Sequence, residues 1–203
     1  MGPGQQPSII YTGIGSRATP EEVLHFMIHI GEVLSSENDY ILRSGGAPGA
    51  DQAFEMGGDS INQEIYIPWP GFEGYDEMED HVVNVQVLTN YDRAQEIAAQ
   101  MHPAWDRCSR GARALHTRNV YQILGWTLDR PSDFVLFWAP VDKNGNITGG
   151  TATAVRLAQE NDILTYNLND PMVREDWEST LAETGDLDEL IARYLRSTTG
   201  STL

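Results

Sequence analysis

The chain has 203 residues, of which 40% are hydrophobic and 21% are charged. This length is enough for one hydrophobic core and short for two domains, and no apolar run approaches the roughly 18 residues that a membrane-spanning helix needs. The formal net charge of −17 argues against a general affinity for nucleic acid, because proteins bind phosphate backbones mainly through positive surfaces.

Residues 1–7 are neither basic nor followed by a long apolar block, so they predict a short flexible leader rather than a secretory signal. Cys108 is the single cysteine, which excludes an intramolecular disulfide and a cysteine-based zinc site, and fits a reducing, cytoplasmic compartment. His25 and His29 lie four residues apart on a predicted helix, but no third ligand is apparent. The sequence therefore predicts no metal site.

The pattern of apolar runs, turns and caps predicts strands that alternate with helices. Thr19, Pro20 and Glu22 form a typical helix start, with an N-cap, a proline at the first helical position and a capping box. In chain order we expect a strand at 8–12, a helix from 19, a strand at 40–44, a short helix to about 57, a strand at 64–67, an irregular stretch at 69–91, helices at 92–101 and 109–124, a strand at 134–138, a helix at 149–160 and a strand at 164–168.

The predicted strands are uniformly apolar, and their connections are long enough for crossovers. Both features indicate a parallel sheet covered on both faces. We therefore expect an α/β, Rossmann-like three-layer domain over residues 8–168, with a mostly parallel sheet of five or more strands. Residues 169–203 are predicted to be an acidic C-terminal extension, with one helix at 186–196 packed on the same domain.

Three glycine-rich turns, at residues 13–17, 45–51 and 149–153, each follow a predicted strand. In an open parallel sheet such loops meet at one edge, where ligands bind. Glycine lets backbone N–H groups approach phosphate oxygens, and the N-terminus of a following helix adds partial positive charge. The turns match neither a Walker loop nor a dinucleotide fingerprint. They predict a phosphate site without naming its ligand.

Thirteen side chains are lysine or arginine, and all but Lys143 are arginine. Several arginines gather within residues 102–119, where Arg110 and Arg113 share a helical face. This segment predicts a set of anion contacts, with a solvated helix face as the alternative. Trp105 and Trp138 could stack on a base, although a position in the core or an interface is favoured for both.

Asp51 and Glu55 follow the second turn. One of them could act as a general acid, but we favour a role for Asp51 in bracing the glycine turn or bonding a ribose hydroxyl. From the turns and the arginine-rich segment together, the predicted ligand contacts are Gly15, Ser16, Arg17, Arg43, Ser44, Gly45, Gly46, Asp51, His116, Arg118, Asn119, Gly149, Gly150, Thr151 and Thr153.

Gly15-Ser16-Arg17, the run from Ser44 to Asp51, and Arg118-Asn119 resemble, in order and spacing, elements of the Rossmann domain of DNA-processing protein A. The resemblance covers residues 8–168 and is strongest to short, phage-type, single-domain relatives. It implies a nucleotide or nucleotide-derived ligand, no required cofactor, a homo-oligomer and a cytoplasmic location, in the host if a phage encodes the chain. No membrane partner is expected, because no apolar run is long enough for a membrane-spanning helix.

The wider superfamily includes the lonely-guy phosphoribohydrolases, whose Gly-Gly-x-Gly-Thr-x-x-Glu motif carries a catalytic glutamate. Arg156 stands at the matching position here, and arginine cannot act as a general acid or base near neutral pH. The favoured hypothesis is therefore a module that holds a nucleotide, in the manner of a phage protein that sequesters a signal. The alternatives are a single-stranded-DNA-binding recombination mediator and a nucleotide N-glycosidase.

Overall fold

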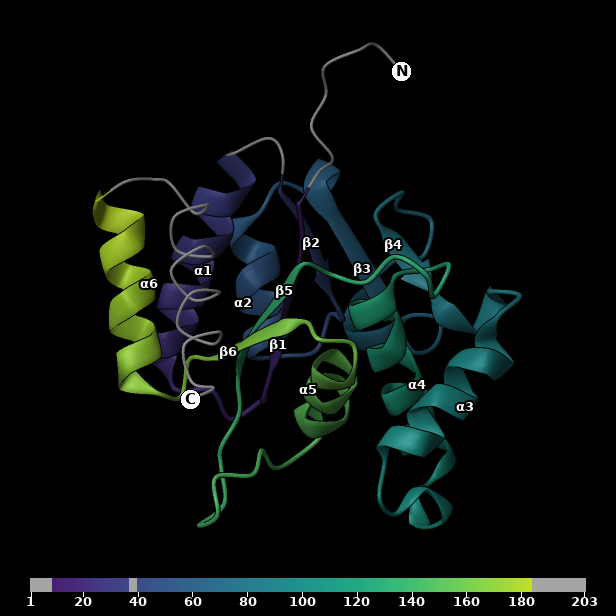
Figure 1. The fold of residues 1–203 in the computed structure, drawn as a ribbon. Coiled ribbons are helices and arrows are strands. Elements are labelled where there is room, and N and C mark those ends of the chain that lie inside the picture. Colours follow the sequence, from purple (N-terminus) through teal and green to yellow (C-terminus); the bar gives the residue numbers. More distant parts are fainter. Residues whose placement is uncertain (1–8, 37–39, 184–203) are drawn as a thin grey trace.

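The structure is a computed structural model that describes residues 9–36 and 40–183. Within these ranges, six strands form one parallel sheet in the order β4-β3-β2-β1-β5-β6 (Figure 1), which confirms the predicted Rossmann-like α/β class. The strands are β1 Ile9–Gly15, β2 Tyr40–Ser44, β3 Gln63–Ile67, β4 Val82–Asn84, β5 Phe134–Trp138 and β6 Leu164–Asn167. The helices are α1 Glu21–Ser36, α2 Ala50–Gly57, α3 Tyr91–Met101, α4 Arg110–Leu124, α5 Thr151–Glu160 and α6 Pro171–Glu183.

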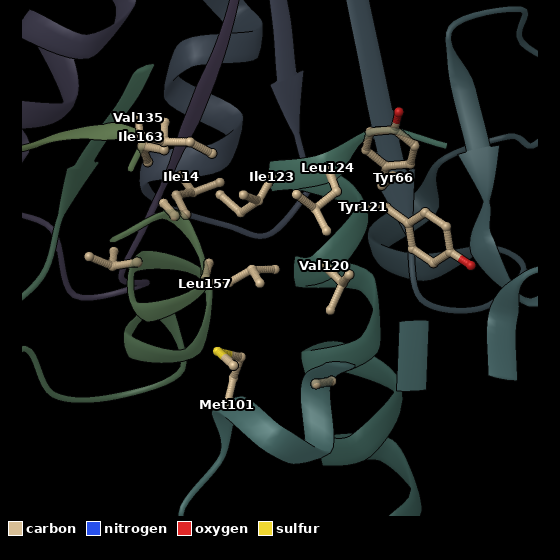
Figure 2. Close-up of a cluster of buried hydrophobic side chains, with 14 of the residues drawn as sticks. Ile14, Tyr66, Met101, Val120, Tyr121, Ile123, Leu124, Val135, Leu157 and Ile163 are labelled. Carbon is tan, nitrogen blue, oxygen red and sulfur yellow. The ribbon is translucent and has the colours of Figure 1, made fainter. Parts of the chain in front are cut away.

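Helices cover both faces of the sheet, and a separate hydrophobic core lies on each face. Successive residues of a strand point to opposite faces, so a central strand such as β5 contributes to both cores. On β5, Phe134 and Leu136 contribute to the core beneath α1, α2 and α6. Val135 and Phe137 contribute to the core beneath α3, α4 and α5, and Figure 2 shows part of this second cluster. Burial on both sides explains why the strand is an uninterrupted apolar run.

Two elements were missed by the sequence patterns. The first is β4, a three-residue strand that pairs with β3 inside the stretch predicted to be irregular. The second is α6, which is anchored by the fully buried Trp177 against Phe134 and Tyr166. The Oδ1 of Asp170 accepts a hydrogen bond from the N–H of Met172 at 2.9 Å and so caps this helix. The predicted leader at 1–7 and the predicted helix at 186–196 lie outside the described residues.

Candidate functional site

A cavity of about 380 Å³ opens beyond the carboxyl ends of β1 and β5. The order of the strands reverses here, since the chain builds outward from β1 in one direction and then resumes on its other side with β5. Such a switch point leaves a crevice in which ligands of α/β proteins bind. We call it the strand-end cavity; it is lined by Ile14, Gly15, Ser16, Arg17, Ala47, Asp51, Ala112, Leu115, His116, Arg118, Asn119, Gln122, Pro140, Thr148, Gly149, Gly150 and Thr151.

The first glycine turn borders the cavity. The end of β1 lies beside β5, with Gly15 opposite Trp138. A Cβ added at Gly15 would lie 2.6 Å from the Cβ of Ala50 and 2.7 Å from the carbonyl oxygen of Trp138, so only glycine fits there. Arg17, whose side chain is 61% exposed, donates to Glu73 at 2.8 Å. The turn therefore offers a closely packed backbone and one accessible guanidinium.

The second turn folds inward rather than toward the cavity. The hydroxyl of Ser44 donates to the carbonyl oxygen of Gly13 at 2.8 Å. The carbonyl oxygen of Gly45 accepts from Arg118, and the N–H of Gly46 donates to Glu55 at 2.9 Å. Among the residues that line the cavity, this turn contributes Ala47 and Asp51. Ser44, Gly45 and Gly46 are therefore placed as supports, not as the ligand contacts predicted from the sequence.

Asp51 and Arg118 form a buried ion pair at the base of the cavity. Asp51 Oδ2 lies 3.3 Å from Arg118 Nη1, and Asp51 Oδ1 accepts from the N–H of Gly15 at 3.0 Å. Burial raises the pKa of Asp51 and lowers that of Arg118, and each charge opposes the other's shift. Asp51 thus ties the first turn to α4, which is the bracing role favoured from the sequence.

Arg43 was predicted to contact the ligand, but it is not among the residues that line the cavity. Its side chain is 1% exposed and points away from the cavity, where Nε donates to Glu64 at 2.7 Å and Nη1 donates to the carbonyl oxygen of Arg130 at 2.6 Å. A Cβ added at Gly125 would lie 2.5 Å from its Nη2, so the end of α4 closes over the guanidinium. Arg43 is a structural cation of the sheet and not a phosphate contact.

The third turn brings the N-terminus of α5 to the cavity. Gly149 adopts a φ of +86°, which favours glycine, and Gly150 is the N-cap without a side-chain hydrogen bond to the helix. Asn119 donates to the carbonyl oxygen of Gly150 at 3.1 Å and so joins α4 to this turn. Thr151 lines the cavity, whereas Thr153 is buried and does not.

His116 lines the cavity from α4, and the fold brings it against two residues that the sequence left apart. Its ring centre lies 4.4 Å from that of His102, and Cys108 Sγ lies 3.7 Å from His102 Nδ1. Burial, together with the neighbouring His102 and Arg118, lowers the pKa of His116 to about 4. The ring is therefore neutral at physiological pH.

The other candidate groups lie away from the cavity. Trp138 belongs to the core, and Trp105 lies beneath the guanidinium of Arg113 at 5.4 Å. Glu55 is bonded to Tyr75 and to the backbone of the second turn. Arg156 is exposed and donates to the carbonyl oxygen of Met101 at the end of α3. Nothing in these placements provides a stacking partner or a free catalytic carboxylate in the cavity.

Sequence reasoning missed the apolar wall of the cavity, which includes Ile14, Leu115 and Pro140. A signal for part of it was present. Ala112, Leu115, His116 and Asn119 recur at i, i+3, i+4 and i+7, so they share one face of α4. Extending this face of α4 by one helical turn from the predicted contacts His116 and Asn119 would have identified Ala112 and Leu115.

Comparisons with known proteins assign no family to the chain. No known family model matches it, and a search of curated proteins finds no match. A solved structure of DNA processing protein A from Helicobacter pylori, described as binding single-stranded DNA, aligns with a TM-score of 0.44 and 14% identity over 94% of this chain and 81% of that one. Within residues 9–36 and 40–183, no helix is long and apolar enough to cross a membrane.

Proposed function

We propose that the strand-end cavity binds a phosphate-bearing nucleotide, or a molecule derived from one, and holds it without changing it. The observation that carries this proposal is that two arginines and a helix N-terminus meet at one cavity of a chain whose net charge is −17. Arg17, Arg118 and the N-terminus of α5 all border one cavity. Phosphate is the common ligand group that bidentate guanidinium groups and helix N-termini both favour.

The phosphate is best accommodated between the first and third turns. The N–H groups of the first turn of a helix have no partner within the helix and carry about half a positive charge together. Gly150 leaves this end of α5 without a side-chain cap, and Thr151 adds a hydroxyl. Among residues 9–36 and 40–183, the side chain of Arg17 pairs with Glu73 in an exposed ion pair. Because such pairs contribute about 0–1 kcal/mol, its guanidinium can exchange Glu73 for a phosphate at small cost.

The remainder of the cavity suits a sugar and a base. Ile14, Leu115 and Pro140 supply apolar surface, while the amides of Asn119 and Gln122 supply polar groups. A volume of about 380 Å³ lies within the range of about 300–1,000 Å³ found for small-molecule pockets. Apolar walls with a few convergent polar groups are typical of sites that orient a ligand.

The arrangement of the acidic groups favours holding over cleavage. Asp51 is the carboxyl group that lines the cavity within the described chain, and it is already bonded to Gly15 and paired with Arg118. Glu55 is engaged with Tyr75, and Arg156 occupies the position of the glutamate in the lonely-guy motif. A general acid needs a proton within reach of the substrate, and no described carboxyl group is both unengaged and in the cavity.

The test compares two arginines that form similar surface ion pairs. Arg17 pairs with Glu73 beside the cavity, and Arg93 pairs with Glu96 on α3 at 3.0 Å. Isothermal titration calorimetry is performed with ribonucleoside mono- and diphosphates and with the matching nucleosides. We expect the wild type to bind at least one phosphorylated compound more tightly than its nucleoside. Arg17→Ala should weaken that binding at least about 10-fold, because a charge-assisted hydrogen bond contributes about 1.5–3 kcal/mol, whereas Arg93→Ala should leave it unchanged.

Three results would overturn the proposal. Equal binding of nucleotide and nucleoside would remove the role of phosphate. Release of free base during incubation would favour the N-glycosidase. Binding of a single-stranded oligonucleotide more tightly than any mononucleotide, with an affinity that falls steeply with salt, would favour the recombination mediator.

A further inference from the structure

A second group of residues that suggests a ligand lies at the wall of the strand-end cavity, where His116 is one of the lining residues. His102 follows the end of α3, Cys108 follows the short helical turn Trp105–Arg107, and His116 lies on α4. Their ligand atoms all lie within 4.8 Å of one another, and each residue is half-buried. We propose that His102, Cys108 and His116 form a binding site for one Zn²⁺ ion at the wall of this cavity.

The spacing of Cys108 and His102 is close to that of two ligands in a tetrahedral site, and His116 lies within 4.8 Å of both. Cys108 Sγ lies 3.7 Å from Nδ1 and 3.8 Å from Nε2 of His102. Zn–S and Zn–N bonds of about 2.3 and 2.0–2.1 Å place sulfur and nitrogen ligands about 3.6 Å apart in a tetrahedron. Thiolate and imidazole ligands bind Zn²⁺ in preference to the hard cations Mg²⁺ and Ca²⁺, which bind mainly oxygen ligands. The donor set and its spacing therefore both indicate zinc.

A buried nitrogen of His116 that lacks a hydrogen-bond partner within residues 9–36 and 40–183 also supports a zinc site. Nδ1 of His116 is buried and has no hydrogen-bond partner in the described part of the chain. A buried polar atom without a partner is uncommon and calls for an explanation such as a bound ion. Nδ1 of His102 instead accepts the N–H of Ala104 at 3.1 Å. Ligation by either nitrogen of His102 requires release of this single contact, because Nδ1 would then either bind the ion or carry the ring proton.

The charges around the cluster make the cysteine its decisive ligand. Arg118 lies near His116, and Arg113 lies over Trp105, which contacts the ring of His102. Both arginines oppose a cation, so the negative charge of a Cys108 thiolate is needed to bind one. Cys108 also borders a second depression, with Arg110, Arg113 and Gln95 among its lining residues, which gives an ion a path from solvent. The three protein ligands leave a fourth position for water or for a ligand in the cavity.

The test uses the full chain without a histidine tag, reduced and stripped of metal. Zn²⁺ is added in competition with a chromophoric chelator, and Co²⁺ serves as the spectroscopic probe. We expect one Zn²⁺ per chain and a thiolate-to-cobalt charge-transfer band. Cys108→Ser, which keeps the size of the side chain, should abolish the band and lower zinc affinity by more than about 10-fold, a loss seen even for residues that only support a ligand. His25→Gln, on the exposed face of α1, is the matched control and should change neither.

Equal zinc affinity of the wild type and Cys108→Ser would overturn the proposal. So would the absence of zinc binding by the reduced, folded wild type, because the three side chains would then form a thiol–imidazole contact only. A circular dichroism spectrum of each variant separates loss of the ligand from loss of the fold. The nucleotide contacts do not depend on this cluster, so failure of the zinc experiment would leave the proposed function standing.

Discussion

Replacing Gly45 by alanine should break the buried ion pair that supports the cavity. Gly45 has an ordinary backbone conformation, so the substitution introduces no backbone strain. Its new Cβ, however, would overlap Nη1 of Arg118 and lie 2.5 Å from Cζ of the same side chain. Arg118 is 5% exposed, and any shift into the strand-end cavity that it lines would take its guanidinium away from Asp51. The guanidinium must therefore leave Asp51, with which it forms the pair.

The expected cost is about 3–5 kcal/mol, the usual loss when a buried charge is deprived of its partner. The assay is equilibrium unfolding in urea, followed by tryptophan fluorescence. Gly111→Ala is the control, since Gly111 lies on α4 with open space around its Cα, and alanine should stabilise the helix by up to about 1 kcal/mol. A Gly45→Ala variant as stable as the wild type would refute the packing of Arg118 against the second turn.

The loss of unfolding free energy in Gly45→Ala should also depend on pH. Burial raises the pKa of Asp51 in the wild type, and Arg118 opposes that rise. When the Arg118 guanidinium is displaced in Gly45→Ala, the folded-state pKa of Asp51 should rise further. A raised folded-state pKa contributes stability below the unfolded pKa of about 3.9 and loses it as pH rises through the folded value. The difference in unfolding free energy between the wild type and Gly45→Ala should therefore be smaller near pH 5 than near pH 8. A difference independent of pH would contradict the assignment to Asp51.

The remaining predictions concern residues outside the cavity. Trp177→Ala should lower the free energy of unfolding, measured in urea, by about 3–5 kcal/mol. Met172→Ala on the same helix is the control, because this residue is 74% exposed, and it should change the free energy by less than about 0.5 kcal/mol. Equal effects of the two substitutions would contradict the anchoring of α6 by Trp177. Arg43→Met should destabilise the protein by about 1–3 kcal/mol through the lost bonds to Glu64 and Arg130. It should leave nucleotide affinity in calorimetry unchanged, and a weakened affinity would restore Arg43 as a ligand contact.

The sequence predicted most of the fold because its signals are local. The apolar run at 134–138 and the capped start of α1 need no knowledge of distant residues. The short strand β4 could not be predicted from three residues, because its pairing with β3 is what stabilises it. The helix α6 did have a signal, since Asp170 and Pro171 form a cap and a first-turn proline. Its acidic composition concealed three apolar residues that pack on the core, the fully buried Trp177 and the partly buried Val173 and Leu181.

The candidate site was partly predictable for a topological reason. Loops after neighbouring parallel strands must meet at one edge, so the turns at 13–17 and 149–153 could be joined without a structure. The direction of a side chain within such an element is set by packing. Arg43 and Ser44 are the last two residues of β2, yet both point into the protein and are satisfied there. Residue type alone does not distinguish a donor offered to a ligand from one used by the fold.

The cluster of His102, Cys108 and His116 was out of reach of sequence reasoning. Five residues separate His102 from Cys108 and seven separate Cys108 from His116, and the cluster joins the end of α3, a loop and α4. The packing of α3 against α4 brings them together. A prediction of no metal site from spacing therefore has little weight where the ligands come from different elements.

The central claim, that the strand-end cavity binds a phosphorylated nucleoside, is tested most directly by the small molecule that the protein carries from the cell. The purified wild type and the Arg17→Ala and Arg93→Ala variants are denatured, and the released molecules are identified by mass spectrometry. We predict a compound with a phosphorylated nucleoside moiety, released near stoichiometrically from the wild type and Arg93→Ala and in much smaller amount from Arg17→Ala. A released molecule that lacks phosphate, or one retained equally by all three chains, would contradict the account.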